Sequence, residues 1–362
     1  MTAGVPRLPV VRLYESVRTA HLERARQLAP ASIVHRVVRY DFDPALAEGL
    51  DLVPAGRVGG AVAVARSGVR VLEVNEPLMT SSLPATALAL AALALRGRGS
   101  RVEVVSYAIG NADPFAAATA PTWRSRLRRR GERLLARAVW RRLDRVVFGT
   151  DAARRTYADV LGRPAARTAA STVHALPAPH PGAGGGARPP VVAFVGALVP
   201  RKGVPVLLAA WPLVVARRPE ARLVVLGKGP LEDAVRSALA ADPSASLEVD
   251  PPRARIHQVL DGARVLTLPS QPSPTWREQV GLPVVEGLSH GCTVVTTTET
   301  GLADWLSAHG HVVVPEPGSA EALADGLVAA LDRARTADDV LGDLPTRDGR
   351  LAADDVLVGG VR

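Results

Sequence analysis

The second half of the chain alternates short apolar runs with helical stretches, and this alternation restricts the fold more than any other feature. Runs such as VVAFVG from Val191 and RVLTLPS from Arg264 are rich in β-branched residues and are separated by segments of helical pattern. Strands that are buried on both faces and joined by crossover helices form parallel sheets. The pattern therefore predicts an α/β fold with a doubly wound, Rossmann-like sheet.

The first half has the same rhythm with more noise, in runs such as VVRLY, RVLEVN and RVEVVSYA. The segment His180–Pro190, HPGAGGGARPP, is rich in glycine and proline and has no hydrophobic periodicity, which is typical of an interdomain linker. We predict one Rossmann-like domain over residues 1–182 and a second over 190–345, facing each other across a central cleft. A terminal segment, 346–362, is expected to pack back on the first domain.

Cysteine usage and hydropathy limit the compartment. Cys292 is the only cysteine in the sequence, which excludes an intrachain disulfide and fits a reducing environment. The N-terminus lacks a basic start followed by a long apolar run, so we expect no signal peptide. The most apolar stretch, 84–95, is too short to cross a bilayer. We therefore expect a cytoplasmic protein without a transmembrane span.

The net charge of +9 is concentrated in one segment, Trp123–Arg145, which has ten arginines against two acidic residues. Leucines and alanines recur there at helical spacing, which predicts an amphipathic helix with a basic face. A solvated surface helix is one interpretation, and peripheral contact with an anionic membrane or a lipid-linked acceptor is another. No nucleic-acid motif or aromatic stacking pattern accompanies the arginines, so we expect no nucleic-acid partner.

Two glutamates, Glu278 and Glu286, stand eight positions apart in the stretch WREQVGLPVVEGLSHG. Pro283 suits the first turn of a short helix and Gly291 suits the residue after its end. Glu278 would then lie in the approaching loop and Glu286 in the helix. A helix N-terminus binds phosphate, and a carboxylate accepts hydrogen bonds from a sugar diol. Phosphate together with a diol indicates a nucleotide ligand.

Two further loops of the second half place cations and glycines after strands. The loop Gly196–Gly203, GALVPRKG, carries Arg201 and Lys202, and the next strand ends in GKGP with Gly227 and Lys228. The carboxyl end of a parallel strand is where a ligand phosphate binds, and glycines allow the backbone to approach it. Ordinary structural turns are the alternative interpretation of both loops.

Taken in order, VGALVPRKG, VLGKGP and LPSQPSPTWREQVGLPVVEGLSHGCTVV resemble the donor domain of GT-B retaining glycosyltransferases, in particular glycosyltransferase family 4. The resemblance covers about residues 191–335. It implies that Glu286 accepts hydrogen bonds from the nucleotide ribose and that Glu278 contacts the transferred sugar. It also implies that Lys202 offsets negative charge on the leaving diphosphate. Glu278 and Lys202 are therefore the catalytic candidates.

The resemblance implies a donor-binding set of eight residues: Gly196, Arg201, Lys202, Gly227, Lys228, Gly281, Leu282 and Glu286. The family commonly has an arginine directly after the glycine of the first loop, where this chain has Ala197. Arg201 and Lys228 are alternative replacements for that missing cation. The implied donor is a nucleotide diphosphate sugar, and neither a metal nor another cofactor is expected.

The sequence motifs for acceptor binding are less specific than those for donor binding. Many relatives carry a histidine after a strand resembling VVSYAIGN, and this chain has none there. The polar candidates are Asn75, Glu76, Asn111 and Asp113.

The histidines of the second half have no metal-ligand spacing. His290, at the end of the glutamate helix, is expected to complement the helix dipole. His257, His309 and His311 stand apart in the sequence.

The sequence as a whole predicts a retaining, hexosyltransferase-type glycosyltransferase that acts on an acceptor hydroxyl of a natural product, a lipid carrier or a glycan. A degenerate sugar-nucleotide-binding protein is one alternative, motivated by Ala197. A GT-B epimerase or phosphorylase is another. The arginine- and alanine-rich composition is typical of GC-rich actinobacterial genomes, which leaves secondary metabolism and cell-envelope glycans both open.

Overall fold

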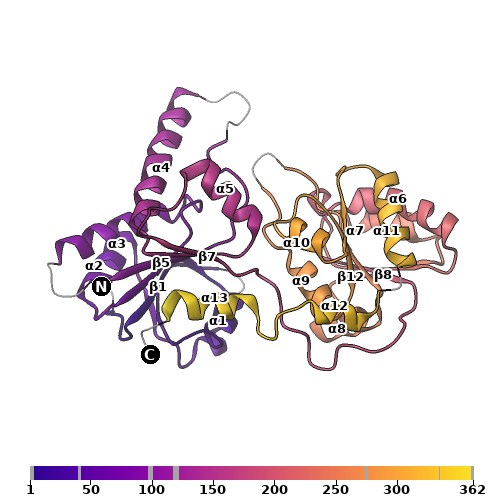
Figure 1. Cartoon of the computed structure of the whole chain (residues 1–362), viewed down its shortest axis with the longest axis horizontal. Helices are drawn as coiled ribbons and strands as arrows, with labels where there is room; N and C mark the ends of the chain where they lie inside the picture. Colours follow the sequence, from indigo (N-terminus) through magenta and orange to yellow (C-terminus); the bar gives the residue numbers. More distant parts are fainter. Residues whose placement is uncertain are drawn as a thin grey trace. The chain divides into compact units, whose positions relative to one another are not determined.

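The computed structural model describes residues 4–39, 42–96, 101–116, 122–273, 276–333 and 335–359. The chain divides by its contacts into unit 1, Met1–His174 with Arg350–Arg362, and unit 2, Ala175–Gly349. Residues 1–3 and 360–362 lie outside the described residues. The expectations about a signal peptide and about the terminal segment concern these residues in part. Each unit is an α/β layer structure built on one parallel sheet (Figure 1).

The described part of unit 1 holds a seven-stranded sheet of order β3-β2-β1-β4-β5-β6-β7 in which all pairs are parallel. The strands are β1 (Val10–Val17), β2 (Ser32–Val38), β3 (Leu52–Pro54), β4 (Val71–Val74), β5 (Glu103–Ala108), β6 (Arg145–Phe148) and β7 (Ala169–Thr172). The helices are α1 (Thr19–Ala25), the 3-10 turn η1 (Pro44–Ala47), α2 (Arg57–Arg66), α3 (Leu83–Leu95), α4 (Trp123–Arg142), α5 (Asp151–Leu161) and α13 (Gly349–Val358).

The C-terminal helix α13 covers one face of the sheet of unit 1 (Figure 1). Alternate strand residues point to the same face, and those of the central strands meet the apolar side of this helix. The resulting cluster includes Val10, Val71, Val105, Val147, Ala353 and Leu357. Two charged groups also link the helix to β1, because buried Arg12 donates from Nη2 to Asp354 Oδ1 at 2.8 Å. Residues distant in sequence thus complete the core of unit 1.

The described part of unit 2 holds a six-stranded parallel sheet of order β10-β9-β8-β11-β12-β13. The strands are β8 (Val191–Val195), β9 (Arg222–Leu226), β10 (Ala245–Glu248), β11 (Val265–Leu268), β12 (Thr293–Thr297) and β13 (Val312–Val314). The helices are the 3-10 turn η2 (Pro200–Lys202), α6 (Val204–Arg217), α7 (Glu232–Leu239), α8 (Arg253–Gly262), α9 (Leu282–Ser289), α10 (Ala303–Ala308), α11 (Ala320–Asp332) and α12 (Ala337–Gly342). The predicted α/β fold with two doubly wound sheets is confirmed.

The glycine- and proline-rich segment 180–190 lies inside unit 2, where specific bonds hold it, although the sequence suggested a flexible linker. The backbone N–H of His180 donates to Ser289 O at 2.8 Å. Arg188 donates to His290 O at 2.7 Å and to Ala263 O at 2.9 Å. These bonds satisfy carbonyls at the ends of α8 and α9, so the segment acts as part of the domain.

Two short edge strands, β3 and β7, were absent from the prediction. β3 has three residues and ends in Pro54, while β7 consists of small and polar residues, AAST. Neither carries the β-branched alternation by which strands are recognised.

Among the described residues, no helix combines the length and apolarity that crossing a membrane requires.

Candidate functional site

The strand order of unit 2 reverses between β8 and β11, which are neighbours in the sheet. In a doubly wound sheet, ligands bind at this switch point, outside the carboxyl ends of the strands. The loops after β8 and β11 meet there, because Gln271 N–H donates to Arg201 O at 2.9 Å. A Cβ on Gly203, whose φ is +77°, would lie 1.9 Å from Pro269 O. Only glycine permits this contact between the two loops.

Lys202 and Glu278 form an ion pair across these two loops. Their side chains are 11% and 10% exposed, so both charges are largely removed from water. Ser270 donates a second hydrogen bond to Glu278 Oε2 at 3.3 Å. The pair thus brings together the two residues predicted to be catalytic, while the contact with Ser270 was not predicted.

An aromatic ring covers the cations of this site. Trp276 lies 4.3 Å from Arg201 Cζ and 5.4 Å from Lys202 Nζ, measured to the ring centroid. A cation over an indole face is stabilised electrostatically. Arg201 is therefore held close to Lys202, consistent with its predicted role in replacing a cation at Ala197. Trp276 was missed as a site residue, although it stands in the same motif as Glu278.

Helix α9 begins beside this pair and carries the second glutamate. Its N-cap is Gly281, with φ +83°, and Leu282 is its first residue. The first backbone N–H groups of a helix have no partner within the helix and favour anions. Glu286, one turn further on, pairs with Arg253 at 3.1 Å and is 23% exposed. Arg253, at the start of α8, was not predicted as its partner.

Three of the predicted donor-site residues are engaged elsewhere. The N–H groups of Gly196 and Gly227 donate to Leu226 O and Glu248 O at 3.0 and 3.1 Å, so they extend the sheet instead of facing a phosphate. A Cβ on Gly227 would lie 1.9 Å from Gly196 O, which explains why this strand end needs glycine. Lys228 pairs with Asp250 at 2.6 Å on the surface, where its side chain is 67% exposed.

The region that holds this site matches a known family. A model of the glycosyl transferases group 1 covers residues 189–333. Residues 189–333 are a glycosyl transferases group 1 domain. The resemblance to glycosyltransferases predicted from the three motifs is thus confirmed. The group 1 domain contains Lys202, Glu278 and the N-terminus of α9.

Curated relatives match about two fifths of the chain. A glycogen synthase of Halorhodospira halophila is 33% identical over 151 residues, covering 40% of this chain and 30% of that protein. A GDP-mannose-dependent monoacylated alpha-(1-6)-phosphatidylinositol monomannoside mannosyltransferase of Corynebacterium glutamicum is 30% identical over 150 residues, covering 40% and 38%. The chain thus matches about a third of the length of these relatives.

Both units together resemble a solved structure. Anabaena Alr3699/HepE, in complex with UDP, superposes with a TM-score of 0.68 over 96% of this chain and 95% of that one, at 13% sequence identity. At this identity the likeness concerns the fold alone. It extends the match beyond the group 1 domain to unit 1 and confirms the predicted GT-B fold.

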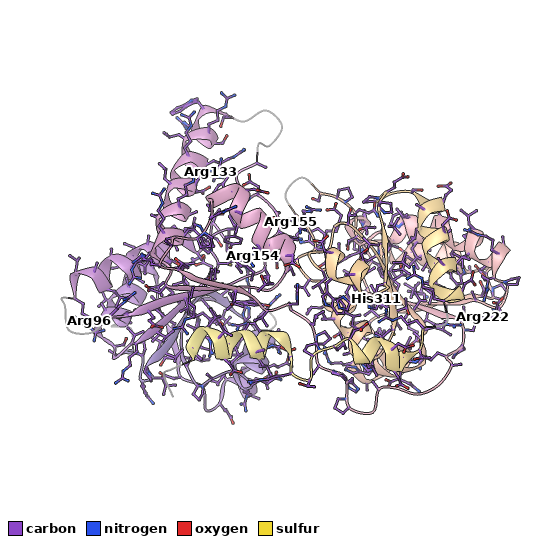
Figure 2. The ribbon with its side chains drawn as sticks, viewed as in Figure 1. Arg96, Arg133, Arg154, Arg155, Arg222 and His311 are labelled. Atoms are coloured by element: carbon purple, nitrogen blue, oxygen red, sulfur yellow. The ribbon has the colours of Figure 1, made fainter. Side chains whose placement is uncertain are left out.

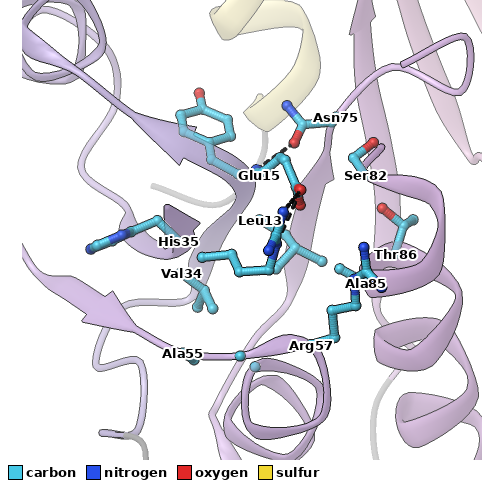
Figure 3. A pocket seen from close by; sticks show the side chains of 14 residues that line it. Leu13, Glu15, Val34, His35, Ala55, Arg57, Asn75, Ser82, Ala85 and Thr86 are labelled. Atoms are coloured by element: carbon cyan, nitrogen blue, oxygen red, sulfur yellow. Dashed lines mark hydrogen bonds and ion pairs between the residues drawn. The ribbon is translucent and has the colours of Figure 1, made fainter. Parts of the chain in front are cut away.

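Unit 1 has a small pocket at its own switch point, between β1 and β4 (Figure 3). Asn75, which follows β4, accepts a hydrogen bond from Glu15 N–H at 2.8 Å. Glu15 pairs with Arg36, and His35 also lines the pocket. Buried Glu15 Oε2 and His35 Nδ1 have no hydrogen-bond partner among the described residues. The sequence predicted Asn75 but missed the other three, because they lie in or beside strands and resemble ordinary sheet residues.

The other acceptor-side candidates have mainly structural bonds. Glu76 Oε2 accepts from Ile109 N–H, Gly110 N–H and Tyr157 Oη at 3.0, 2.8 and 3.0 Å, and burial raises its pKa. Glu76 and Asn75 also line a second pocket of about 250 Å³. Asp113 accepts from Phe115 N–H at 2.8 Å within a turn, and Asn111 is buried. Of the four candidates, Asn75 and Glu76 reach a pocket.

The basic segment is a helix, as predicted, and its N-terminal part is exposed. In α4, Trp123, Leu127 and Leu134 are 69%, 64% and 67% exposed and recur on one side at helical spacing. Figure 2 shows Arg133 on this helix, with Arg154 and Arg155 on α5. Apolar and basic side chains therefore share the surface of α4.

His290 does not act as a cation at the end of α9. Its side chain is fully buried, and this burial lowers its pKa despite the hydrogen bond to Asp261. A neutral imidazole cannot complement the helix dipole as a charge, so the predicted role is wrong.

Proposed function

We propose that the chain transfers a sugar from a nucleotide diphosphate sugar to an acceptor hydroxyl. The observation that carries the proposal is the Lys202–Glu278 pair beside the N-terminus of α9, at the switch point of a group 1 domain. The curated relatives bear the names of sugar transferases, and Alr3699/HepE binds UDP. Lys202 would bind the phosphate, Glu286 the ribose and Glu278 the sugar.

The donor diphosphate would bind between Lys202 and the first amides of α9. The ammonium and the helix dipole favour negative charge, which increases on the diphosphate as the glycosidic bond breaks. Arg201, held over Trp276, would supply the second cation. Glu286 would accept hydrogen bonds from the ribose in place of Arg253.

We further propose that transfer retains the anomeric configuration by same-face displacement. Glu278 is paired with Lys202 and bonded to Ser270, which suits holding a cation and a sugar hydroxyl more than nucleophilic attack. The bond from the acceptor oxygen to the anomeric carbon would form as the bond to the diphosphate breaks. The proton of the acceptor hydroxyl would pass to a diphosphate oxygen. No metal is needed for this arrangement.

The acceptor would bind in the pocket of about 250 Å³ in unit 1 that Asn75 and Glu76 line. We propose a membrane-associated acceptor, because Trp123, Leu127 and Leu134 form an exposed apolar stripe on a helix crowded with arginines. Such a helix inserts its apolar side among anionic lipids.

The catalytic proposal is tested by assaying nucleoside diphosphate release and sugar transfer from a panel of UDP- and GDP-sugars. Glu278→Gln should lower kcat about 100-fold or more, since it removes a group that orients both Lys202 and the sugar. Glu232→Gln, an exposed residue of α7 that pairs with Arg236, is the matched control and should leave kcat unchanged. Turnover equal in wild type and Glu278→Gln would refute the assignment. Wild-type binding of nucleoside diphosphate without turnover would favour the degenerate binding protein.

The membrane proposal is tested separately by sedimentation with vesicles of phosphatidylglycerol and phosphatidylcholine. The variant Leu127→Asp/Leu134→Asp should bind these vesicles at least 10-fold more weakly than wild type. Val58→Asp, on an equally exposed residue of α2, should bind as wild type does. Binding that is equal in all three proteins would refute a role for α4.

A further inference from the structure

Three histidines from separate segments lie together in unit 2, at the C-terminal end of α9, where His290 N–H donates to Glu286 O at 3.2 Å. His180 belongs to the segment before β8, His257 to α8, and His290 follows the last residue of α9. Their ligating nitrogen atoms all lie within 4.8 Å of one another. The ring centroid of His290 is 4.3 Å from that of His180 and 5.0 Å from that of His257.

Hydrogen bonds orient the central ring as a ligand. His290 Nδ1 lies 2.6 Å from Asp261 Oδ1, so Nδ1 carries the proton and Nε2 has a free lone pair. That Nε2 faces His257 Nδ1 at 2.8 Å. A carboxylate behind the imidazole, which fixes its tautomer, is the usual outer partner of a metal-binding histidine.

His180 supplies an unsatisfied nitrogen. Its Nδ1 is buried and has no hydrogen-bond partner among the described residues. A buried polar atom without a partner costs free energy, unless a ligand or water satisfies it. Its backbone is fixed by the bond from His180 N–H to Ser289 O at 2.8 Å. The ring is thus held over His290 by the main chain of the same helix end.

The distances suit a small metal ion. Zinc–nitrogen bonds of about 2.0–2.1 Å in a tetrahedral site place the ligand nitrogens about 3.3 Å apart. Since no pair exceeds 4.8 Å, side-chain rotations that close the widest gap by about 1.5 Å would complete the site. Cys292 is nearby, but its Sγ donates to Leu260 O and Ala263 O at 3.3 and 3.5 Å within the core.

We propose that His180, His257 and His290 bind one divalent transition-metal ion, of which Zn²⁺ is the best match to three imidazoles. The ion would tie the segment 180–190 to the ends of α8 and α9. On binding, the proton on His257 Nδ1 moves to Nε2 through solvent, which frees Nδ1 as a ligand. The fourth position would be filled by water. None of the three histidines is among the residues proposed for transfer.

The test uses the full chain without an affinity tag, freed of metal by a chelator and titrated with ZnCl₂ in a calorimeter. Wild type should bind one Zn²⁺ per chain. His180→Ala and His257→Ala should each weaken binding at least 10-fold, and Asp261→Asn about 10- to 100-fold. The control is His309→Ala, because His309 bonds to Trp305 O within α10 at 2.8 Å and lies outside the cluster. It should bind Zn²⁺ as wild type does.

Co²⁺ provides a second measurement that does not depend on the stability of the variants. Wild type loaded with Co²⁺ should develop the visible absorption of a four-coordinate site, and Zn²⁺ should displace it. The melting temperature of wild type should also fall on adding EDTA, while that of His180→Ala should not change. Failure of wild type to bind Zn²⁺, or equally tight binding by His180→Ala/His257→Ala, would overturn the proposal.

Discussion

Units 1 and 2 share a strand order around their switch points but place different groups there. In unit 2 the two loops carry a lysine, a glutamate and the start of a helix. In unit 1 the corresponding strands carry Glu15 and Asn75, and one carboxylate oxygen of Glu15 has no partner among the described residues. The sheet therefore determines where a ligand binds, and the loop residues determine which ligand it is.

The two units also differ in what completes them. Unit 1 needs α13, whose Asp354 lies 342 positions from its partner Arg12. Unit 2 closes on itself, through close contacts between the loops of neighbouring strands, such as that of Gly203 after β8 with Pro269 after β11. Substitution of Asp354 should therefore destabilise unit 1, and substitution of Gly203 should destabilise unit 2.

The largest effect is expected in unit 1, for Asp354→Ala. It leaves Arg12 and Arg350 beside Glu73 without their second carboxylate, at a site where Arg12 is 1% exposed. Removing one partner of a buried ion network costs about 3–5 kcal/mol. Urea unfolding should show this loss in unit 1, whereas Val356→Ala, on the exposed side of α13, should change stability by less than about 0.5 kcal/mol. A loss below 1 kcal/mol would mean that α13 does not complete unit 1.

Glycine substitutions should give the next largest effect, with opposite signs in the two units. Gly203→Ala introduces a Cβ 1.9 Å from Pro269 O at a φ of +77°, and should destabilise unit 2 by about 3 kcal/mol. Gly131→Ala in α4 of unit 1 meets nothing within 4 Å and should stabilise that helix by about 0.5–1 kcal/mol. Both values come from urea unfolding. If Gly203→Ala and Gly131→Ala changed the free energy of unfolding equally, the close approach of the loops after β8 and β11 would be contradicted.

Acid should weaken unit 2 more than unit 1, because burial lowers the pKa of His290 and His311 in unit 2 and of His35 in unit 1. Burial lowers the pKa of His311 from 6.5 to about 3. As the pH falls below 6.5, the unfolded chain binds a proton at His311 that folded unit 2 does not bind, and the free energy of unfolding decreases. Burial opposes ionisation of Glu73 in unit 1, but Arg350 and Arg12 hold its pKa below 4.5. Stability from this carboxylate is therefore lost only as the pH falls below 4.5.

Hydrogen exchange by mass spectrometry, corrected for intrinsic rates, can follow each unit between pH 7 and pH 4. Each group changes the free energy of unfolding by up to about 1.4 kcal/mol per pH unit. His311→Gln should flatten the dependence of unit 2 above pH 5. Earlier opening of unit 1 would reverse the expected order.

The sequence revealed the site in unit 2 better than that in unit 1, for a physical reason. Binding of a diphosphate requires glycines, a cation and a helix N-terminus at fixed places in the loops. These requirements produce the recognisable sequence motifs around Lys202 and Glu278. The pairing of Glu15 with Arg36 leaves no such pattern, because both residues lie in strands. Helix α6, Val204–Arg217, can be predicted from the sequence, since the apolar periodicity of VPVLLAAWPLVVAR is local.

Contacts distant in sequence could not be predicted. Lys228 was a candidate for the diphosphate, but its partner Asp250 comes from the loop after β10 and is placed only by the sheet order. His180, His257 and His290 are likewise brought together by the packing of α8 and α9.

The central claim, that a diphosphate binds at the switch point of unit 2, is tested most directly with the two lysines of the chain. Titrations of UDP and GDP should be compared for wild type, Lys202→Met and Lys228→Met. Loss of a charge-assisted hydrogen bond should raise the Kd of Lys202→Met about 10- to 100-fold. Lys202→Met/Glu278→Gln shows how much of that rise is repulsion from the unpaired carboxylate. Lys228→Met, which breaks an exposed pair with Asp250, should bind within about 2-fold of wild type. Equal affinity of wild type and Lys202→Met, or a greater loss in Lys228→Met, would contradict the account.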